Sequence, residues 1–406
     1  MTLLAQAFRE QVKQTKDISQ INEMTYSVSY PTGFLNLDFA NGYIQEVNGK
    51  MRFELGISDG SINMIISESG TGKTTLVSQM ASNIIKPFKS STIFYDQAEV
   101  GTNIQRIKQL SGLSDEDFKN RFIVRDSGIT IESIYDRVKM IHDIKVGDQN
   151  NYTYDTGMQY QGSNVIKFEP TLYIVDSVKM VLSKKNAEAE ETNNMSAATN
   201  AKANSEYYTK MVPLCREANI IMILINHITT DINMGFLPKK AELAYLKQGE
   251  HISGGKSLTY IQNNIFRLDI KSKLKPEEGF GITGSVVSID IVKSRTNKSS
   301  RGRCTLVFDQ EIGYDPDLSL FLLLKDEKIL EGSGAYLKIP GYDVKFSMKQ
   351  FKGLLYSDPE FYKAFAITCA NYLKQGLIEE YNRMKQEEKK ALDKSPYQAI
   401  IDSLIS

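Results

Sequence analysis

Short apolar runs alternate with stretches of helical period over about residues 30–330 of the chain. Near-continuous apolar runs of this length are typical of strands that are buried on both faces of a sheet. The predicted strands are 62–67, 92–96, 122–126, 171–176, 220–226, 264–270, 285–293 and 304–309. Strands that alternate with helices predict an α/β fold with a mainly parallel central sheet flanked by helices. The last three strands alternate more strongly and could form an antiparallel extension.

Both ends of the chain have helical patterns. Residues 1–29 are predicted to form an N-terminal helical arm, whose apolar face carries Leu3, Leu4, Phe8 and Val12. This arm could pack as a cap on the core or dock on a neighbouring subunit, and the pattern favours neither. A core of residues 30–332 is expected next, followed by a small, mostly helical C-terminal region at 333–406.

Two segments within the predicted core lack an apolar period, namely residues 184–204 and 229–253. Each follows a core strand or its first turn, and loops of this length inside a compact domain are usually functional or disordered. Residues 143–168 form a further polar insert, which we predict to be a surface hairpin.

A turn rich in small residues lies between the strand at 62–67 and an amphipathic helix that reaches residue 85. It contains Gly72-Lys73-Thr74-Thr75, and this order of strand, turn and helix is typical of a phosphate-binding loop. In such loops glycines let backbone N–H groups face the phosphates, the lysine reaches the terminal phosphates, and the threonine hydroxyl binds Mg²⁺. Ser67 occupies the place of the first glycine in the pattern G-x-x-x-x-G-K-[ST].

Composition narrows the classes of protein to consider. The chain has 406 residues with 49 basic and 49 acidic side chains, so any nucleic-acid contact must come from local segments. Its three cysteines are scattered, which argues against a disulfide framework or a zinc site. The longest apolar run, 220–225, is too short to cross a bilayer, and the charged N-terminus is unlike a signal peptide. A soluble intracellular protein is therefore expected.

Polar residues follow several of the predicted strands at their carboxyl ends, where ligands bind in open α/β sheets. Asp176 ends the strand at 171–176 and could support Mg²⁺, while Glu99 follows the strand at 92–96 and could act as a general base. His227 comes directly after the strand at 220–226 and could sense a γ-phosphate. Lys293 and Arg295 end another strand, where such residues are either solvated tips or electrostatic fingers for a neighbouring subunit's nucleotide.

Six motifs in order resemble the RecA family of recombinases, and most closely its phage UvsX branch. The lead-in TGFLNLDFANG, at residues 32–42, precedes the phosphate-binding loop. After the loop come FYD with E-x-G-T, then VDS, INH, SGG and KSRT, in the family's order and at similar spacing. The match covers roughly residues 30–320 and implies a RecA-like P-loop ATPase core.

The resemblance implies ATP and Mg²⁺ as cofactors. It assigns Lys73, Glu99, His227, Lys293 and Arg295 to catalysis, the last two acting across a filament interface. Nucleotide-binding residues would be Ser67, Glu68, Ser69, Gly70, Thr71, Gly72, Lys73, Thr74, Thr75, Asp176 and, in a base pocket, Asn103 and Arg106. Thr74 and Asp176 would be the Mg²⁺ residues. The spacing between Asp96 and Glu99 is one residue longer than is usual in the family. This difference argues against Glu99 as the catalytic base.

The resemblance also implies two DNA-binding loops, at about 184–204 and 228–255. Met195, Met234 and Phe236 would separate bases, and Gly254 and Gly255 would contact phosphates. Implied partners are single- and double-stranded DNA, further copies of the chain in a helical filament, and single-strand-binding and loader proteins, with no membrane. The implied compartment is the cytoplasm of a phage-infected bacterium.

The leading hypothesis is an ATP-dependent filament that pairs and exchanges homologous DNA strands. One alternative is a ring-shaped DNA helicase on the same core fold. Another is a hydrolysis-poor, nucleotide-switched mediator that binds single-stranded DNA, motivated by Ser67 and by the shifted Glu99. For the C-terminal region, a duplex-DNA gateway, a partner dock and a stabilising cap all stay open.

Overall fold

The computed structural model describes residues 27–47, 50–99, 103–160, 162–187, 194–230, 243–253, 255–295, 302–332 and 336–393. They divide into two compact units, one within Met1–Lys273 and Thr283–Ser319 and the other within Leu274–Ile282 and Leu320–Ser406. Of the predicted N-terminal helical arm, residues 1–26 lie outside the described residues, while residues 27–29 are described and are not helical.

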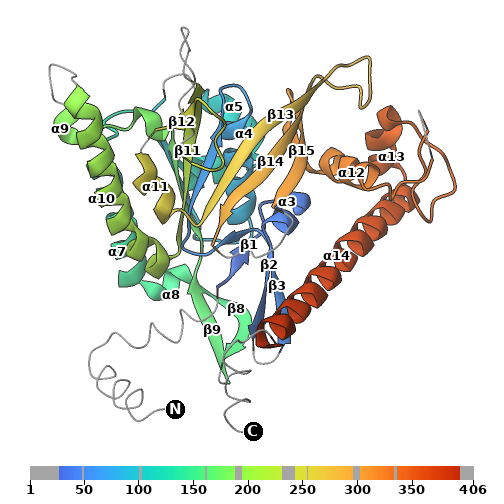
Figure 1. Cartoon of the computed structure of the whole chain (residues 1–406), viewed down its shortest axis with the longest axis horizontal. Coiled ribbons are helices and arrows are strands. Elements are labelled where there is room, and N and C mark those ends of the chain that lie inside the picture. Colours follow the sequence, from blue (N-terminus) through green and yellow to red (C-terminus); the bar gives the residue numbers. More distant parts are fainter. Residues whose placement is uncertain are drawn as a thin grey trace. The chain divides into compact units, whose positions relative to one another are not determined.

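The first unit is built on a central sheet that contains ten strands in the part of the chain described (Figure 1). Its strands are β5 (Ile62–Ser67), β6 (Ile93–Gln97), β7 (Phe122–Arg125), β10 (Thr171–Asp176), β11 (Ile220–Thr230), β12 (Glu250–Ile252), β13 (Asn264–Leu274), β14 (Gly284–Ser294), β15 (Arg303–Asp309) and β16 (Gly313–Asp315). The order is β16-β15-β14-β13-β5-β11-β10-β6-β7, with β12 beside β11. All eight predicted strands are present, which confirms the expected mainly parallel α/β sheet.

The direction of the strands changes along this sheet. From β13 through β5, β11, β10 and β6 to β7 the neighbours are parallel. The pairs β14–β15 and β15–β16 are antiparallel. The predicted antiparallel extension is therefore correct for β14 and β15 and wrong for β13, which pairs in parallel with β5.

Helices cover both faces of the sheet, and successive strand residues alternate between two apolar clusters. The main helices are α4 (Lys73–Ile85), α7 (Ile131–Gly147) and α10 (Asn194–Ala218). On β5, Ile65 packs in one cluster with Val77 of α4, while Met64 and Ile66 pack in the other with Val138 of α7. Burial on both faces explains why the strands are continuous apolar runs.

Smaller elements complete the first unit. The helices are α3 (Leu35–Ala40), α5 (Ile104–Ser111), α6 (Asp115–Arg121), α8 (Gln149–Tyr152), η1 (Val178–Met180), α9 (Lys184–Ala187) and α11 (Gly255–Ile261). The strands are β1 (Ser29–Tyr30), β2 (Tyr43–Val47), β3 (Lys50–Glu54), β4 (Ile57–Ser58), β8 (Thr153–Tyr160) and β9 (Ser163–Phe168). The last two form the predicted surface hairpin, although residues 143–152 are mostly helical.

The first segment without an apolar period is not a loop throughout. Residues 184–187 form α9, and α10 begins at Asn194, so the loop expectation for 184–204 is wrong over 194–204. Among the described side chains of α10, the fully buried apolar ones, Tyr208, Met211 and Cys215, lie further along the helix, and the partly buried Ala203 and Tyr207 pack against the same cluster. The start of this helix therefore lacks the apolar period by which helices are recognised in a sequence.

The second unit is mostly helical in its described residues. It contains α12 (Pro316–Asp326) from Leu320 onward, η2 (Met348–Gln350), α13 (Phe351–Ser357) and α14 (Pro359–Asp393). Phe321, Phe346, Phe351 and Phe361 pack together, with ring centroids 4.5–6.4 Å apart. The unit starts earlier than the predicted boundary at residue 333 and includes the loop 274–282. Of the described helices, none is long and apolar enough to cross a membrane.

Candidate functional site

The turn between β5 and α4 needs glycine at residue 72. Gly72 immediately precedes α4 and has φ 87°, a left-handed conformation that side chains disfavour. A Cβ there would lie 2.9 Å from the hydroxyl oxygen of Tyr314. That hydroxyl donates a hydrogen bond of 2.8 Å to the Thr71 carbonyl oxygen. Gly70, with φ 77°, supplies a second left-handed position, so the turn can direct its backbone N–H groups inward.

Ser67 ends β5 beneath this turn and takes part in its hydrogen bonds. The Lys73 ammonium donates to the Ser67 hydroxyl at 3.0 Å, and the Ser67 hydroxyl donates to the Glu68 carbonyl at 2.9 Å. The Ser67 hydroxyl also contacts the Thr71 hydroxyl. A serine in place of the first glycine is therefore compatible with this turn, and it adds a polar contact for the lysine.

Lys73 is buried, and its ammonium is held by the loop. It donates to the carbonyl oxygens of Ser67 at 3.2 Å and Glu68 at 2.8 Å. Burial lowers the pKa of Lys73 to about 8, against the opposing effect of the Asp176 and Glu99 carboxylates. A desolvated ammonium at the N-terminus of a helix is a favourable place for a phosphate.

Asp176 ends β10 directly opposite the start of α4. Its Oδ2 atom accepts hydrogen bonds from the Thr74 hydroxyl at 2.8 Å and the Tyr95 hydroxyl at 2.6 Å. Burial raises the pKa of Asp176, and these two hydrogen bonds oppose that rise. A threonine hydroxyl and a carboxylate in contact are the oxygen ligands that Mg²⁺ prefers beside a nucleotide. The residues present therefore fit a Mg²⁺ ion bound together with a nucleotide.

Glu99 reaches the same place despite its unusual spacing. The backbone N–H groups of Ala98 and Glu99 both donate to the Asp176 carbonyl, at 2.6 and 2.9 Å, and hold the chain against β10. The Glu99 Oε2 atom lies 2.8 Å from His227 Nε2. On the other side of the ring, His227 Nδ1 lies 3.5 Å from Lys73 Nζ. A proton on Nε2 and a lone pair on Nδ1 satisfy both contacts at once.

These side chains line one cavity of about 350 Å³ at the carboxyl ends of the parallel strands. Its lining consists of Ser69, Gly70, Thr71, Gly72, Lys73, Thr74, Thr75, Glu99, Asp176 and His227. All of them are residues that the sequence singled out, so the structure brings the predicted phosphate, metal and base positions together.

Four other predicted site residues do not line this cavity and make hydrogen bonds outside it. Asn103 caps α5 by accepting N–H hydrogen bonds from Gln105 and Arg106, and Arg106 donates to the carbonyls of Gln310 and Glu311. Lys293 and Arg295 reach the last turn of α11. Lys293 donates to the carbonyls of Thr259 at 2.5 Å and Tyr260 at 3.1 Å, and Arg295 also binds the Tyr260 carbonyl. Burial lowers the pKa of Lys293 to about 8, helped by the Arg295 charge.

The predicted DNA contacts are mostly outside the described residues. Met234, Phe236 and Gly254 lie there, as does the side chain of Met195, whose backbone is in α10. Gly255 is the first residue of α11.

Sequence reasoning missed Arg267 and Glu250, which anchor the end of the second segment together with Asn226 of the INH motif. Arg267 on β13 is buried and binds both carboxylate oxygens of Glu250, at 2.7 and 3.0 Å. Asn226 donates to the Ser253 carbonyl at 2.8 Å and accepts from the His227 backbone N–H at 2.9 Å. The Arg within the apolar run NIFRLDI was the one available signal, because a buried arginine requires a partner.

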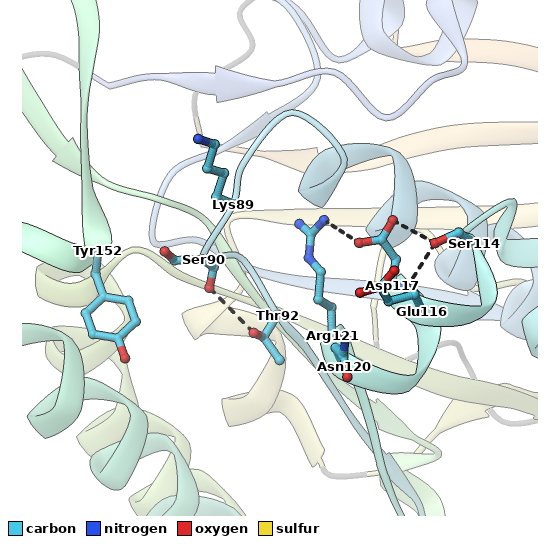
Figure 2. Close-up of a pocket in the computed structure, with 9 residues that line it drawn as sticks. All are labelled: Lys89, Ser90, Thr92, Ser114, Glu116, Asp117, Asn120, Arg121 and Tyr152. Atoms are coloured by element: carbon cyan, nitrogen blue, oxygen red, sulfur yellow. Dashed lines mark hydrogen bonds and ion pairs between the residues drawn. The ribbon is translucent and has the colours of Figure 1, made fainter.

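A larger cavity, of about 540 Å³, is lined mainly by residues that come just before the first residues of β6 and β7, and Figure 2 draws these lining residues. Figure 2 shows its Arg121 turned toward Asp117, which in turn bonds Ser114. Arg121 also donates to the carbonyls of Ile85, Phe88 and Ser91. These contacts give Arg121 a structural role at the end of α4, and no motif residue lines this cavity.

Comparison with models of known protein families finds no match for this chain, and no curated protein matches it significantly. The assignment of a function therefore depends on the motif residues and on the geometry of the cavity that they line.

Proposed function

We propose that this protein is a DNA-dependent ATPase with a RecA-like core, which forms filaments on single-stranded DNA and exchanges homologous strands. One observation carries the proposal: Lys73 and Thr74 at the start of α4, Glu99 after β6, Asp176 at the end of β10 and His227 within β11 converge on a single cavity. Convergence of a phosphate-binding turn with a carboxylate pair and a polar strand end is what nucleotide hydrolysis requires.

Each residue of the cavity has a distinct role in this proposal. The turn and Lys73 bind the phosphates, because the N–H groups at the start of α4 and the buried ammonium all favour an anion there. Thr74 and Asp176 would hold Mg²⁺, which when bound neutralises charge on the phosphates. Glu99 orients a water molecule and accepts its proton. His227 positions the Glu99 carboxylate through the contact of 2.8 Å.

The DNA-binding part of the proposal rests on the order of the motifs and on chain connectivity. Strand β11 carries His227 and continues to Thr230, and the second predicted DNA segment, at about 228–255, begins with the residue after His227. A change at the γ-phosphate therefore has a short covalent path to that segment. The positions of Lys293 and Arg295 outside the cavity of their own chain favour a role at a neighbouring subunit's nucleotide.

The test is ATP hydrolysis with and without single-stranded DNA, with the same samples viewed by negative-stain microscopy. We expect strong stimulation by DNA, helical filaments, and joint-molecule formation with a homologous duplex. Closed rings with directional unwinding would identify a helicase instead. DNA-bound filaments without stimulated hydrolysis would identify a nucleotide-switched mediator.

Arg295→Ala should abolish most of the DNA-stimulated hydrolysis while the isolated chain still binds ATP. The expected loss is about 10³-fold, as for other cations that stabilise transferring phosphates from a neighbouring subunit. Steady-state hydrolysis in the presence of single-stranded DNA measures it, and Lys293→Ala should behave in the same way. Arg303→Ala is the matched control, because that arginine pairs with Asp290 across β14–β15 and lines no part of the cavity.

Mixing Arg295→Ala protein with Glu99→Gln protein, which is expected to bind nucleotide without hydrolysing it, distinguishes action across an interface from a local effect. In a mixed filament an intact nucleotide site of the first variant can meet an intact Arg295 of the second. Partial recovery of hydrolysis is expected. Activity no higher than the sum of the separate variants would contradict a role across the interface.

A further inference from the structure

Strands β6 and β10 exchange two tyrosine–aspartate hydrogen bonds. Tyr95 on β6 donates to Asp176 Oδ2 on β10 at 2.6 Å, and Tyr173 on β10 donates to Asp96 Oδ2 on β6 at 2.5 Å. The two strands are parallel and adjacent, and successive residues alternate between the faces of the sheet. Tyr95 accordingly lies in the cluster on the α4 face, and Tyr173 in the cluster on the α7 face.

The two bonds differ in what else the carboxylate contacts. Asp176 lines the nucleotide cavity, and its Oδ2 atom also accepts the hydrogen bond from Thr74. Asp96 is instead paired with Arg125 and Arg137 on the far face of the sheet. The bond from Tyr95 is therefore directed at the cavity, while the bond from Tyr173 belongs to a structural ion-pair cluster.

The Tyr95 ring is held rigidly. It is fully buried, and it packs against the Phe122 ring with centroids 5.9 Å apart. A fixed hydroxyl that donates to a buried carboxylate restricts the rotation of that carboxylate. Such outer hydrogen bonds orient the groups that hold a metal, and their loss typically weakens metal binding by about 10–100-fold.

We propose that Tyr95 is a positioning residue for the divalent cation, acting through Asp176 and Thr74. This inference rests on the proposed nucleotide function. Two hydroxyl donors on one oxygen, Oδ2, set the orientation of the carboxylate. The Thr74 hydroxyl can keep its proton directed at Asp176 while its lone pairs face the cation. Without the Tyr95 hydroxyl, the Asp176 carboxylate loses one of the two hydrogen bonds that fix its plane.

The experiment is the Mg²⁺ dependence of nucleotide binding by the full chain without DNA. Fluorescent ADP is titrated into wild type, Tyr95→Phe and Tyr173→Phe protein, first in EDTA and then over a range of MgCl₂. We expect the half-saturating Mg²⁺ concentration to rise by about 10-fold or more in Tyr95→Phe. It should not change in Tyr173→Phe, which loses an equivalent buried bond on the other face. Affinity for ADP in EDTA should be the same in all three.

Thermal unfolding without metal is the structural readout, and both variants should lose comparable stability. A double variant supplies the second test: in an Asp176→Asn background, Tyr95→Phe should not alter the Mg²⁺ dependence further. Equal Mg²⁺ shifts in Tyr95→Phe and Tyr173→Phe, or no shift in either, would overturn the inference. Wild-type protein that binds no nucleotide at any Mg²⁺ concentration would overturn the proposed function together with this inference. Nucleotide binding by wild type without the expected difference between the two variants would overturn the inference alone.

Discussion

Lys73→Ala is expected to abolish nucleotide-dependent DNA binding by this protein. The Lys73 ammonium is buried in the turn before α4 and is the main positive charge that lines the cavity. Losing charged hydrogen bonds to phosphates costs about 3 kcal/mol, which corresponds to about 100-fold weaker nucleotide binding or more. Titration with a fluorescent nucleotide measures the loss of nucleotide affinity. DNA binding measured with and without ATP then shows whether the nucleotide effect is gone.

The matched control for this substitution is Lys145→Met. Lys145 is also a buried lysine that donates to a carbonyl and a hydroxyl, at Glu169 and Thr171, and burial lowers its pKa to about 7. It lies outside the cavity lining, so its replacement should leave nucleotide affinity unchanged even if stability falls. Undiminished, ATP-dependent DNA binding by Lys73→Ala protein would mean that the nucleotide site lies elsewhere.

Glu99→Gln is expected to reduce the rate of ATP hydrolysis by about 10²–10⁴-fold while nucleotide binding is retained. Glutamine has nearly the shape of glutamate and can still bond His227, so the cavity should keep its form. What it loses is the capacity to accept a proton from water. Single-turnover hydrolysis measures the chemical step, and a parallel titration with fluorescent ADP measures binding.

Glu217→Gln is the control for this second prediction. Glu217 Oε2 lies 2.9 Å from His142 Nε2, a glutamate–histidine contact like the one in the cavity but on the surface of the same unit. Its replacement should leave hydrolysis unchanged. Wild-type protein that hydrolyses ATP no faster than Glu99→Gln protein would show that Glu99 is not an effective base, and would favour the nucleotide-switched mediator.

Much of the fold could be predicted from local patterns. Strands buried on both faces must be apolar at nearly every position, so β5, β10 and β11 stand out as near-continuous apolar runs. The turn before α4 is equally local, because its glycines and Lys73 are neighbours in the chain. The carboxyl-end positions of Asp176 and His227 followed from the rule that parallel strands present those ends at one edge.

Contacts between distant parts of the chain decided the features of the fold and the site that local patterns did not predict. The distance of Glu99 from His227 depends on two N–H groups bonded to the Asp176 carbonyl, a contact between different strands that no local motif encodes. The helical state of 194–204 is likewise absent from local periodicity, since the fully buried apolar residues among the described side chains of α10, Tyr208, Met211 and Cys215, lie further along the helix.

The same division applies to individual side chains. Residue types and spacing identified which groups could act at a nucleotide: Lys73, Thr74, Asp176 and Glu99. Whether a polar residue turns toward the cavity or away from it depends on its strand partners. Tyr95 and Tyr173 show this most directly, since one tyrosine reaches Asp176 at the cavity and the other reaches an ion-pair cluster on the far face. Sequence patterns specify the elements and their chemistry because these are local properties, while orientation and partnership arise only when distant strands pair.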